Sequence, residues 1–419
     1  MSSSAWASSL RVLASAAVAV VASLGLAAGP ARAADPIKIG FSMALTGPFS
    51  ANGKAALLAN QMWAEDQNAK GGLLGRPIQL VYYDDQSQVA QVPGIYTKLI
   101  DIDKVDLLIS GYGTATVAAA MPTVIQHGYT FMSLFGLAVN EQFKYDRYFQ
   151  IAPFGSGGGT AFSEGFFDAA MTMNPKPKTL AILIADSEFP QTAAAGAREW
   201  AKKYSLNIVY DRNFPPTTVD YSPLVRAAQA AKPDIVYVAC FPQDTVGIIQ
   251  AMHETGFAPK LLGGGMVGPQ YAALKQKLGP NLNGIMTFET YVPAKTTDFP
   301  GIKAFLDRYQ PKASSVGVDA LGYYLPPFSY AGLQVLGDAM TATKSLDQKK
   351  LADYIHATTF KTVVGDVRFN AEGEWKDQRM FQVQYQGIKD GSLEQFKQPG
   401  TQVIVFPAAF KSGELQYPK

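Results

Sequence analysis

The chain has 419 residues, of which 47% are hydrophobic and 17% charged, and this globular composition excludes disordered and collagen-like chains. Its length predicts two to three domains, and its 36 basic and 34 acidic residues nearly balance, which excludes the basic surface that nucleic acids require. Because the chain has one cysteine, Cys240, and three widely spaced histidines, an internal disulfide, a Cys-based zinc site and a histidine cluster are excluded, and we expect no metal.

The first 33 residues have the pattern of a secretory signal peptide. A short polar segment with one positive charge, Arg11, leads into an apolar, Ala-rich stretch, and Ala31-Arg32-Ala33 then offers a small-residue cleavage site. A membrane anchor is the alternative, but Gly29-Pro30 ends the apolar run before the cleavage site. We therefore expect cleavage after Ala33 and a neutral mature protein in the periplasm.

Strand-like and helix-like segments alternate along the mature chain. Strands are expected at 37–43, 78–83, 105–109 and 129–133, with helices at 55–69, 89–100 and 116–126 between them. The alternation then restarts, with strands at 179–185, 207–210, 235–239 and 260–263 and helices at 158–173, 192–204, 222–231 and 245–255. Strands separated by helices indicate parallel sheets, so we predict two α/β lobes, with the glycine-rich stretch 153–159 crossing between them.

The last part of the chain contains a further mixture of elements. After a strand at 285–290, helices are expected at 302–309, 319–340 and 349–357, and strands near 380–385 and 402–406. Pro326-Pro327 lies inside the second of these helices, so we expect a kink or a break there. This part is too short for a domain of its own and must complete one or both lobes.

No motif for nucleotide chemistry or hydrolysis is complete. The loop 47–54 has five residues rather than four between its glycines, and Ala55 stands where a P-loop has Ser or Thr. The glycines at 111–113 and 155–157 begin dinucleotide fingerprints that lack the third glycine, and no G-x-S-x-G sequence is present. Asp84-Asp85 could be an acid/base or metal pair, although a solvated strand end explains it more simply. We therefore expect no cofactor and no catalytic residue.

The loop 110–116 links a buried strand to a helix at the carboxyl edge of the first sheet, where α/β folds bind ligands. Thr114 is placed as the N-cap, and the free N–H groups of Ala115 and Thr116 would face outward at the positive end of the helix. Such a helix start can bind a carboxylate without a charged side chain. The alternative, that Thr114 only caps its own helix, stays open because caps are commoner than anion sites.

Aromatic residues recur where predicted strands end. Tyr112 and Phe135 occupy such positions in the first lobe, and Phe189 and Phe241 occupy them in the second. Four aromatic residues at strand exits predict the walls of an apolar cleft more readily than four separate core positions.

The sequence resembles the leucine/isoleucine/valine-binding family of periplasmic solute-binding proteins. The resemblance runs from Pro36 to about Tyr330 and is carried by Ile37-Lys38-Ile39-Gly40-Phe41-Ser42-Met43, Thr46-Gly47-Pro48, Asn68-Ala69-Lys70-Gly71-Gly72-Leu73-Leu74-Gly75-Arg76-Pro77-Ile78-Gln79-Leu80 and Asp84-Asp85. It implies a type I periplasmic binding protein, with two Rossmann-like lobes that are joined by three hinge crossings and close on a small-molecule ligand. It also implies delivery of that ligand to an ABC permease in the inner membrane, and we expect the protein to be a monomer.

The resemblance places the crossings near Ala152, Glu289 and Met380. The first lobe would then contain residues 34–152 and 290–380, and the second lobe residues 153–289 and 381–419. It also implies ligand-binding residues. Thr114 aligns with the Ser or Thr that binds the ligand carboxylate. The remaining positions expected in the pocket are Asn52, Tyr112, Gly113, Phe135, Gly136, Leu137, Phe189, Phe241, Gly265 and Met266.

Two of these positions depart from the family. Gly265 aligns with the acidic residue that pairs with the ligand ammonium, and Leu137 replaces a hydroxyl residue. Because burying an ammonium without an anionic partner costs on the order of several kcal/mol, we predict a hydrophobic or aromatic carboxylate without an amine, unless Glu289 or Asp244 reaches the cleft. The alternatives are an ordinary branched-chain amino acid binding protein, a periplasmic ligand sensor and a periplasmic α/β enzyme, although the sequence offers no acid, base or metal for the enzyme.

Overall fold

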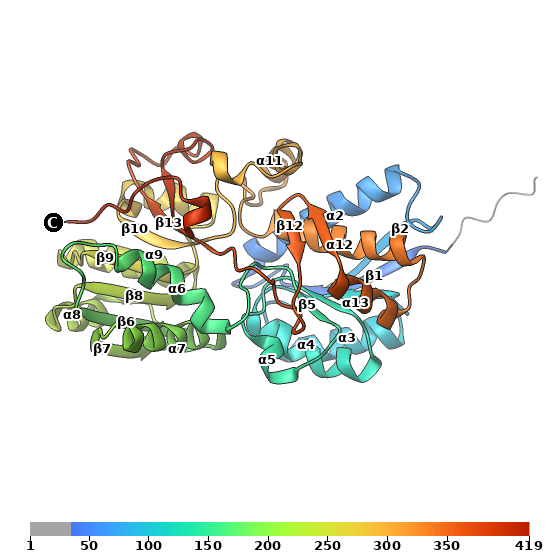
Figure 1. Cartoon of the computed structure of the whole chain (residues 1–419), viewed down its shortest axis with the longest axis horizontal. Helices are drawn as coiled ribbons and strands as arrows, with labels where there is room; N and C mark the ends of the chain where they lie inside the picture. Colours follow the sequence, from blue (N-terminus) through green and yellow to red (C-terminus); the bar gives the residue numbers. More distant parts are fainter. Residues whose placement is uncertain (1–34, 419) are drawn as a thin grey trace, which may run out of the picture.

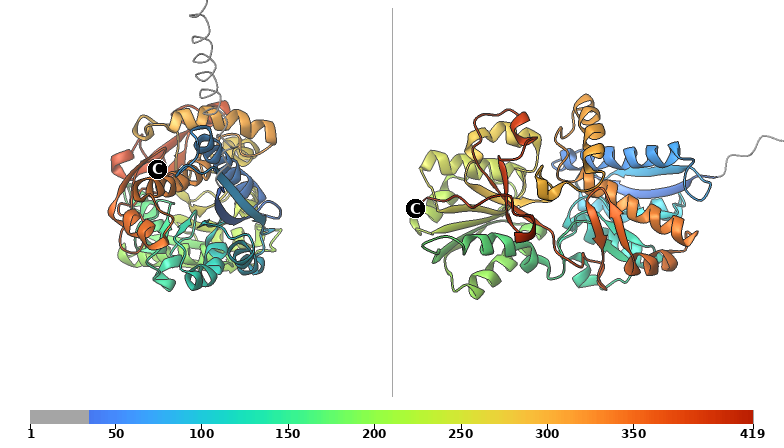
Figure 2. Two further views of the ribbon diagram at one scale, coloured as in Figure 1. Left: turned by 90° about the vertical axis from the view of Figure 1, so that its right-hand side faces the viewer. Right: turned by 45° about the horizontal axis from the view of Figure 1, so that its top comes forward.

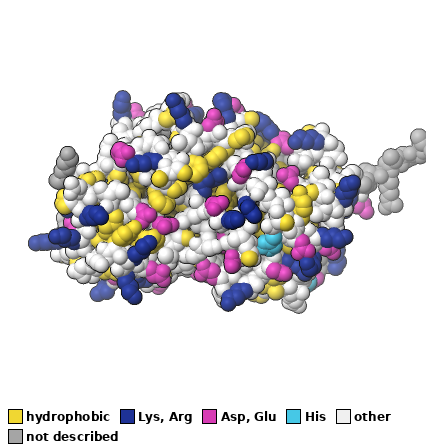
Figure 3. Space-filling model, in the orientation of Figure 1, with side chains coloured by type: hydrophobic (Ala, Val, Ile, Leu, Met, Phe, Trp, Pro, Cys, Tyr) yellow, Lys and Arg dark blue, Asp and Glu magenta, His cyan; other side chains and the backbone are white. Residues whose placement is uncertain are grey.

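The computed structural model describes residues 35–418, so the predicted signal peptide and its cleavage site lie outside the described residues. Two α/β lobes lie side by side along the long axis of the molecule in Figure 1, and the right-hand view of Figure 2 shows the same separation. Within residues 35–418 no helix is long and apolar enough to cross a membrane. Basic and acidic side chains are interspersed over the face shown in Figure 3, as the balanced composition predicts.

The first lobe contains a five-stranded sheet with the order β2-β1-β3-β4-β5, and all of its pairings are parallel. Its strands are β1 (Ile37–Met43), β2 (Ile78–Asp84), β3 (Leu107–Ile109), β4 (Phe131–Ser133) and β5 (Tyr148–Gln150). β1 lies between two other strands and is buried over most of its length. Burial on both faces explains its nearly continuous apolar sequence.

The second lobe contains a seven-stranded sheet with the order β14-β13-β10-β9-β8-β6-β7. Its strands are β6 (Thr179–Ala185), β7 (Asn207–Phe214), β8 (Ile235–Cys240), β9 (Leu261–Met266), β10 (Ile285–Glu289), β13 (Phe381–Tyr385) and β14 (Gln402–Phe406). β6 to β10 pair in parallel, whereas β13 and β14 form an antiparallel edge. The predicted two-lobed α/β fold with parallel sheets is confirmed, and the antiparallel edge adds to it.

Helices cover both sheets. In the first lobe they are α2 (Ser50–Ala69), α3 (Val92–Asp101), α4 (Thr114–His127), α5 (Val139–Phe143), α12 (Pro326–Thr343) and α13 (Gln348–Ala357). In the second lobe they are α6 (Gly158–Ala170), α7 (Glu188–Lys203), α8 (Ser222–Ala230), α9 (Pro242–Thr255) and α10 (Ala272–Leu278). α11 (Ile302–Val316) contacts α2, and α2 also packs against α12.

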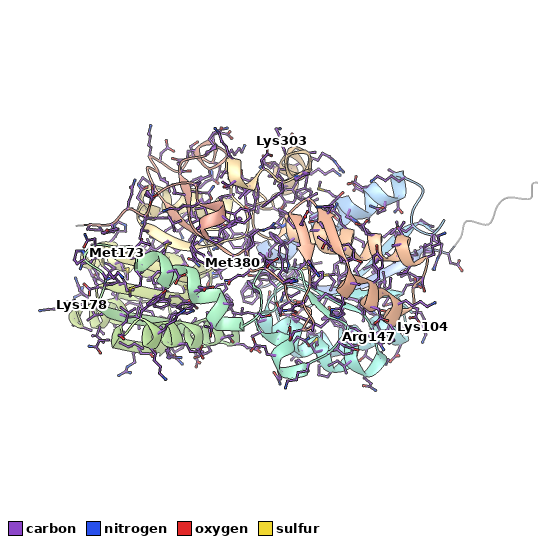
Figure 4. All side chains as sticks on the ribbon, viewed as in Figure 1. Lys104, Arg147, Met173, Lys178, Lys303 and Met380 are labelled. Atoms are coloured by element: carbon purple, nitrogen blue, oxygen red, sulfur yellow. The ribbon has the colours of Figure 1, made fainter. Side chains whose placement is uncertain are left out.

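The chain passes between the lobes three times. It leaves the first sheet after β5, returns after β10, and crosses again between the hairpin of β11 (Thr359–Thr362) and β12 (Gly365–Arg368) and strand β13. The expected crossing points near Ala152, Glu289 and Met380 lie within or beside these connections. Met380 is buried and lies near the boundary between the lobes in Figure 4.

The structure differs from the predicted elements in several places. Pro326 and Pro327 begin α12 instead of interrupting a helix, and residues 319–325 are not helical. Proline is compatible with the first turn because the N–H groups there have no intrahelical partner. The β11–β12 hairpin, α5, β5 and α10 were not predicted, since segments of three to seven residues carry too few positions for a periodic pattern. The helix predicted at 302–309 continues to Val316.

Candidate ligand-binding site

A cavity of about 190 Å³ lies between the two lobes. Loops that follow β3 and β4 in the first lobe face loops that follow β6, β8 and β9 in the second lobe, so the carboxyl ends of parallel strands meet across it. The cavity is lined by Phe49, Val89, Tyr112, Gly113, Thr114, Ala115, Thr116, Phe135, Phe154, Phe162, Ser187, Glu188, Phe189, Phe241, Val267, Phe288 and Tyr324.

Aromatic rings make up much of the cavity wall. The ring centroids of Phe135 and Tyr324 are 4.9 Å apart, and the two rings meet edge to face with 71° between their planes. The ring centroids of Phe49 in the first lobe and Phe241 in the second lobe are 5.1 Å apart, so the lobes touch through two rings that border the cavity. Rings in such tilted and edge-to-face contacts attract one another, and the space that they enclose favours a flat apolar ligand.

The structure corrects the predicted capping role of Thr114. α4 begins at Thr114, and its N-cap is Gly113, whose φ of 101° suits glycine and strains other residues. The Thr114 Oγ1 accepts a hydrogen bond from the Leu137 N–H at 3.2 Å, on the loop after β4. Because this bond uses the hydroxyl only as an acceptor, its proton remains available to donate to a ligand oxygen.

The first turn of α4 borders the cavity, because Thr114, Ala115 and Thr116 all line it. The N–H of Val117 donates to the Gly113 carbonyl at 2.9 Å, whereas the N–H groups before it precede the first intrahelical hydrogen bond. The helix also carries a partial positive charge at this end. The start of α4 therefore offers several donors to one anionic group without a charged side chain.

Two polar residues of the second lobe also line the cavity. Ser187 is the N-cap of α7, but it makes no side-chain cap bond, and among the described residues its buried Oγ has no hydrogen-bond partner. The third residue of α7 is Pro190, which lacks the N–H that a capping Ser commonly binds. Glu188, the one acidic residue of the lining, is exposed, and the burial of part of its surface raises the pKa of its carboxyl group.

The structure brings six of the predicted site residues together in the lining: Tyr112, Gly113, Thr114, Phe135, Phe189 and Phe241. The other five lie outside it: Asn52, Gly136, Leu137, Gly265 and Met266. Gly265 and Met266 are still inside β9, and Val267, the first residue after this strand, forms the wall instead. Asn52 donates from its side-chain amide to the Tyr271 hydroxyl. Gly136 and Leu137 make backbone hydrogen bonds beside the cavity: the Gly136 carbonyl accepts from the Gln150 side chain, and the Leu137 N–H donates to Thr114.

Sequence reasoning missed nine lining residues: Phe49, Val89, Phe154, Phe162, Ser187, Glu188, Val267, Phe288 and Tyr324. Ser187 and Glu188 follow β6 closely, so the rule that selected Phe189 at the strand exit could have found them. Phe162 lies on α6 and Tyr324 lies in the loop before α12. Nothing local distinguishes these two aromatic residues from core residues.

Neither of the two acids considered as ammonium partners lines the cavity. Glu289 is fully buried, its Oε1 lies 3.1 Å from the Lys275 Nζ, and the same oxygen accepts a hydrogen bond from the Tyr385 hydroxyl at 2.8 Å. Asp244 accepts a hydrogen bond from the Phe241 N–H at 2.9 Å and thereby supports the start of α9. Both carboxylates are therefore engaged within the second lobe.

Both acids of the Asp84-Asp85 pair hold loop backbone, but the expected solvated strand end is wrong for Asp85. This residue is 1% exposed, and its Oδ1 accepts a hydrogen bond from the Ser87 N–H at 2.9 Å. Asp84 accepts hydrogen bonds from the Leu45 N–H at 2.9 Å and from the Thr46 hydroxyl at 2.6 Å, so it holds the loop after β1. Among residues 35–418, no group of three or more His, Cys, Asp or Glu side chains is placed to hold a metal ion.

Two α/β lobes that enclose an apolar cavity, with hydrogen-bond donors at one end, define a two-lobed ligand-binding protein with the type I periplasmic fold. The chain belongs to the periplasmic binding protein family, whose family model matches residues 36–392. The resemblance predicted from the sequence is thereby confirmed.

Individual relatives cover most of the chain. The Leu/Ile/Val-binding protein homolog 7 of Brucella abortus (strain 2308) is 24% identical over 406 residues, which are 94% of this chain and 97% of the relative. A branched-chain amino acid transporter substrate-binding protein from Streptococcus pneumoniae, solved with isoleucine, has a TM-score of 0.71 at 19% identity and covers 84% of this chain and 97% of its own. An ABC transporter solute-binding protein from R. palustris, solved with benzoate, has a TM-score of 0.72 at 17% identity, with coverages of 90% and 98%. At these identities the two solved structures establish a common fold.

Proposed function

We propose that this protein is the periplasmic solute-binding component of an ABC importer and that it binds a small aromatic carboxylate between its lobes. The observation that carries this proposal is a cavity of about 190 Å³ with nine aromatic residues and the start of one helix in its lining. A dry apolar cavity of about 150 Å³ accommodates benzene, so this one has room for a single ring and a carboxyl group. The family supports the periplasmic location, and the benzoate complex of the R. palustris relative supports the ligand class.

The donors at the start of α4 suit a carboxylate. The Thr114 hydroxyl proton and the N–H groups of Ala115 and Thr116 would bind its oxygens, and each hydrogen bond to a charged group contributes roughly 1.5–3 kcal/mol. An α-amino acid would bring in addition an ammonium group, and the one carboxylate that the lining offers it, Glu188, is exposed. An exposed ion pair returns only about 0–1 kcal/mol, which is less than the cost, on the order of several kcal/mol, of burying the ammonium. A micromolar ligand has only about 8 kcal/mol of binding free energy in total, so this cost disfavours an amine.

A branched-chain amino acid is the second candidate ligand, because Glu188 places a carboxylate in the lining and the S. pneumoniae relative was solved with isoleucine. The Glu188→Gln variant gives opposite results for the two candidates. It removes a like charge from an aromatic acid and strengthens its binding by about two- to fivefold, whereas it removes the ammonium partner of an amino acid and weakens its binding. Since burial raises the pKa of Glu188, acidification toward that pKa changes wild-type affinity in the same direction as the variant does.

Calorimetry on refolded, ligand-stripped protein tests the ligand class. We expect benzoate and related aromatic acids to bind more tightly than leucine and phenylalanine. Tight leucine binding with no response to any aromatic acid would refute the aromatic carboxylate and would leave a branched-chain amino acid carrier.

Closure of the lobes is the expected mechanism. We propose that residues 34–152 with 290–380 move as one body, and residues 153–289 with 381–419 as the other, about the three crossings. The protein is expected to be a monomer whose radius of gyration falls when the ligand binds, and the ligand is expected to be recovered chemically unchanged. An altered ligand after long incubation would favour the α/β enzyme, and uptake that persists in cells lacking the protein would favour the sensor.

A further inference from the structure

A hydrogen bond between two buried polar side chains joins the lobes outside the cavity lining. Asn52, in the first turn of α2, donates from Nδ2 to the hydroxyl of Tyr271, which precedes α10 in the second lobe. Asn52 is 2% exposed and Tyr271 is 6% exposed. Separation of the lobes at this point would break the bond and expose both groups to water, so the bond belongs to the closed arrangement.

Tyr271 connects this bond to the cavity wall. Its ring meets the ring of Tyr324 edge to face, with 5.6 Å between centroids, and the Tyr324 hydroxyl lies 3.2 Å from the Tyr112 hydroxyl. Tyr324 and Tyr112 both line the cavity. Burial raises the pKa of all three tyrosines, so their hydroxyls stay protonated at neutral pH and can both donate and accept hydrogen bonds. A continuous set of contacts therefore runs from the cavity wall to the bond between the lobes.

We propose that Asn52 and Tyr271 form a lobe lock, a hydrogen-bonded pair that sets ligand affinity by stabilising the closed arrangement without touching the ligand. This inference rests on the proposed function only for the choice of the probe ligand. A ligand that binds the closed form gains affinity from every contact that exists only in that form. Loss of the lobe lock is therefore expected to act mainly on the dissociation rate, because the closed complex then opens more readily. Asn52 is a positioning residue in this scheme.

Asn60 offers a matched control on the same helix. It lies about two turns after Asn52, is fully buried, and its Oδ1 accepts a hydrogen bond from the Ser329 hydroxyl of α12 at 2.8 Å. Because α2 and α12 pack together in the first lobe, Asn60→Ala removes a comparable buried amide without changing a contact between the lobes.

The test compares wild type, Asn52→Ala, Tyr271→Phe, the double variant and Asn60→Ala. Benzoate affinity, the benzoate dissociation rate and the unfolding temperature without ligand are measured for each. We expect each single change in the lobe lock to weaken benzoate binding by about three- to twentyfold through faster dissociation. The double variant should bind benzoate as tightly as the single variant with the lower benzoate affinity, since both changes remove the same bond. Asn60→Ala should lower the unfolding temperature and leave the affinity unchanged.

Unchanged benzoate affinity in Asn52→Ala, or fully additive losses in the double variant, would overturn the lobe lock and leave the proposed function standing. If wild type binds leucine and no aromatic acid, the proposed ligand class fails, and the same comparison with leucine decides on the lobe lock. If wild type binds neither, the radius of gyration of the ligand-free proteins decides. A larger value for Asn52→Ala than for wild type and Asn60→Ala supports the lobe lock, and equal values overturn it.

Discussion

Replacement of Thr114 by Val removes the hydroxyl that would anchor the ligand carboxylate and nearly preserves the shape of the side chain. In the structure this hydroxyl already accepts the Leu137 N–H at 3.2 Å, so its proton is the part left for the ligand. Loss of one hydrogen bond to a charged group costs roughly 1.5–3 kcal/mol, so benzoate binding should weaken about ten- to hundredfold. The variant also leaves the buried Leu137 N–H without its acceptor, which should lower the free energy of unfolding by about 1–3 kcal/mol.

Calorimetric affinity and chemical unfolding, measured on the same Thr114→Val protein, separate these two effects. Thr114→Ser is the matched control, because it keeps the hydroxyl and should retain most of the affinity and the bond to Leu137. Unchanged affinity together with lowered stability in Thr114→Val would refute the anchor. Thr114 would then serve only to join the loops after β3 and β4.

Two further changes test the second lobe. Ser187→Ala should weaken benzoate binding about three- to tenfold at an unchanged unfolding temperature, because Ser187 does not cap α7 and its Oγ has no partner among the described residues. Ser133→Ala, which removes another buried Oγ without a described partner but outside the cavity lining, is the calorimetric control, and equal affinities of the two variants would contradict this role of Ser187. Lys275→Ala should lower the free energy of unfolding by about 3–5 kcal/mol, since it leaves the fully buried Glu289 without its counter-charge. Urea denaturation measures that loss, and a loss well below 1 kcal/mol would show that the pair contributes little.

Part of the site was predictable because its signals are local. Tyr112 and Thr114 follow one strand, and Phe189 and Phe241 follow two others, and parallel strands with helical connections bring such exits to one edge of each sheet. The hydrogen-bond partner of Asn52 could not be predicted in this way. A buried Asn in a first helical turn carries no signal of its partner, and Tyr271, 219 residues away, becomes that partner only when the lobes meet.

The two α/β lobes, the family and the strand exits that border the cavity were predictable from the amino-acid order, because the alternation of strands and helices and the apolar runs are encoded within a few consecutive residues. Three features became apparent only in the folded chain: Thr114 binds Leu137 instead of capping α4, Val267 and not Met266 forms the wall, and Phe49 meets Phe241 between the lobes. These features depend on how far each strand extends and on contacts between residues distant in the chain. Such contacts are set by the packing of whole helices and strands against one another, and no single segment of the sequence specifies that packing.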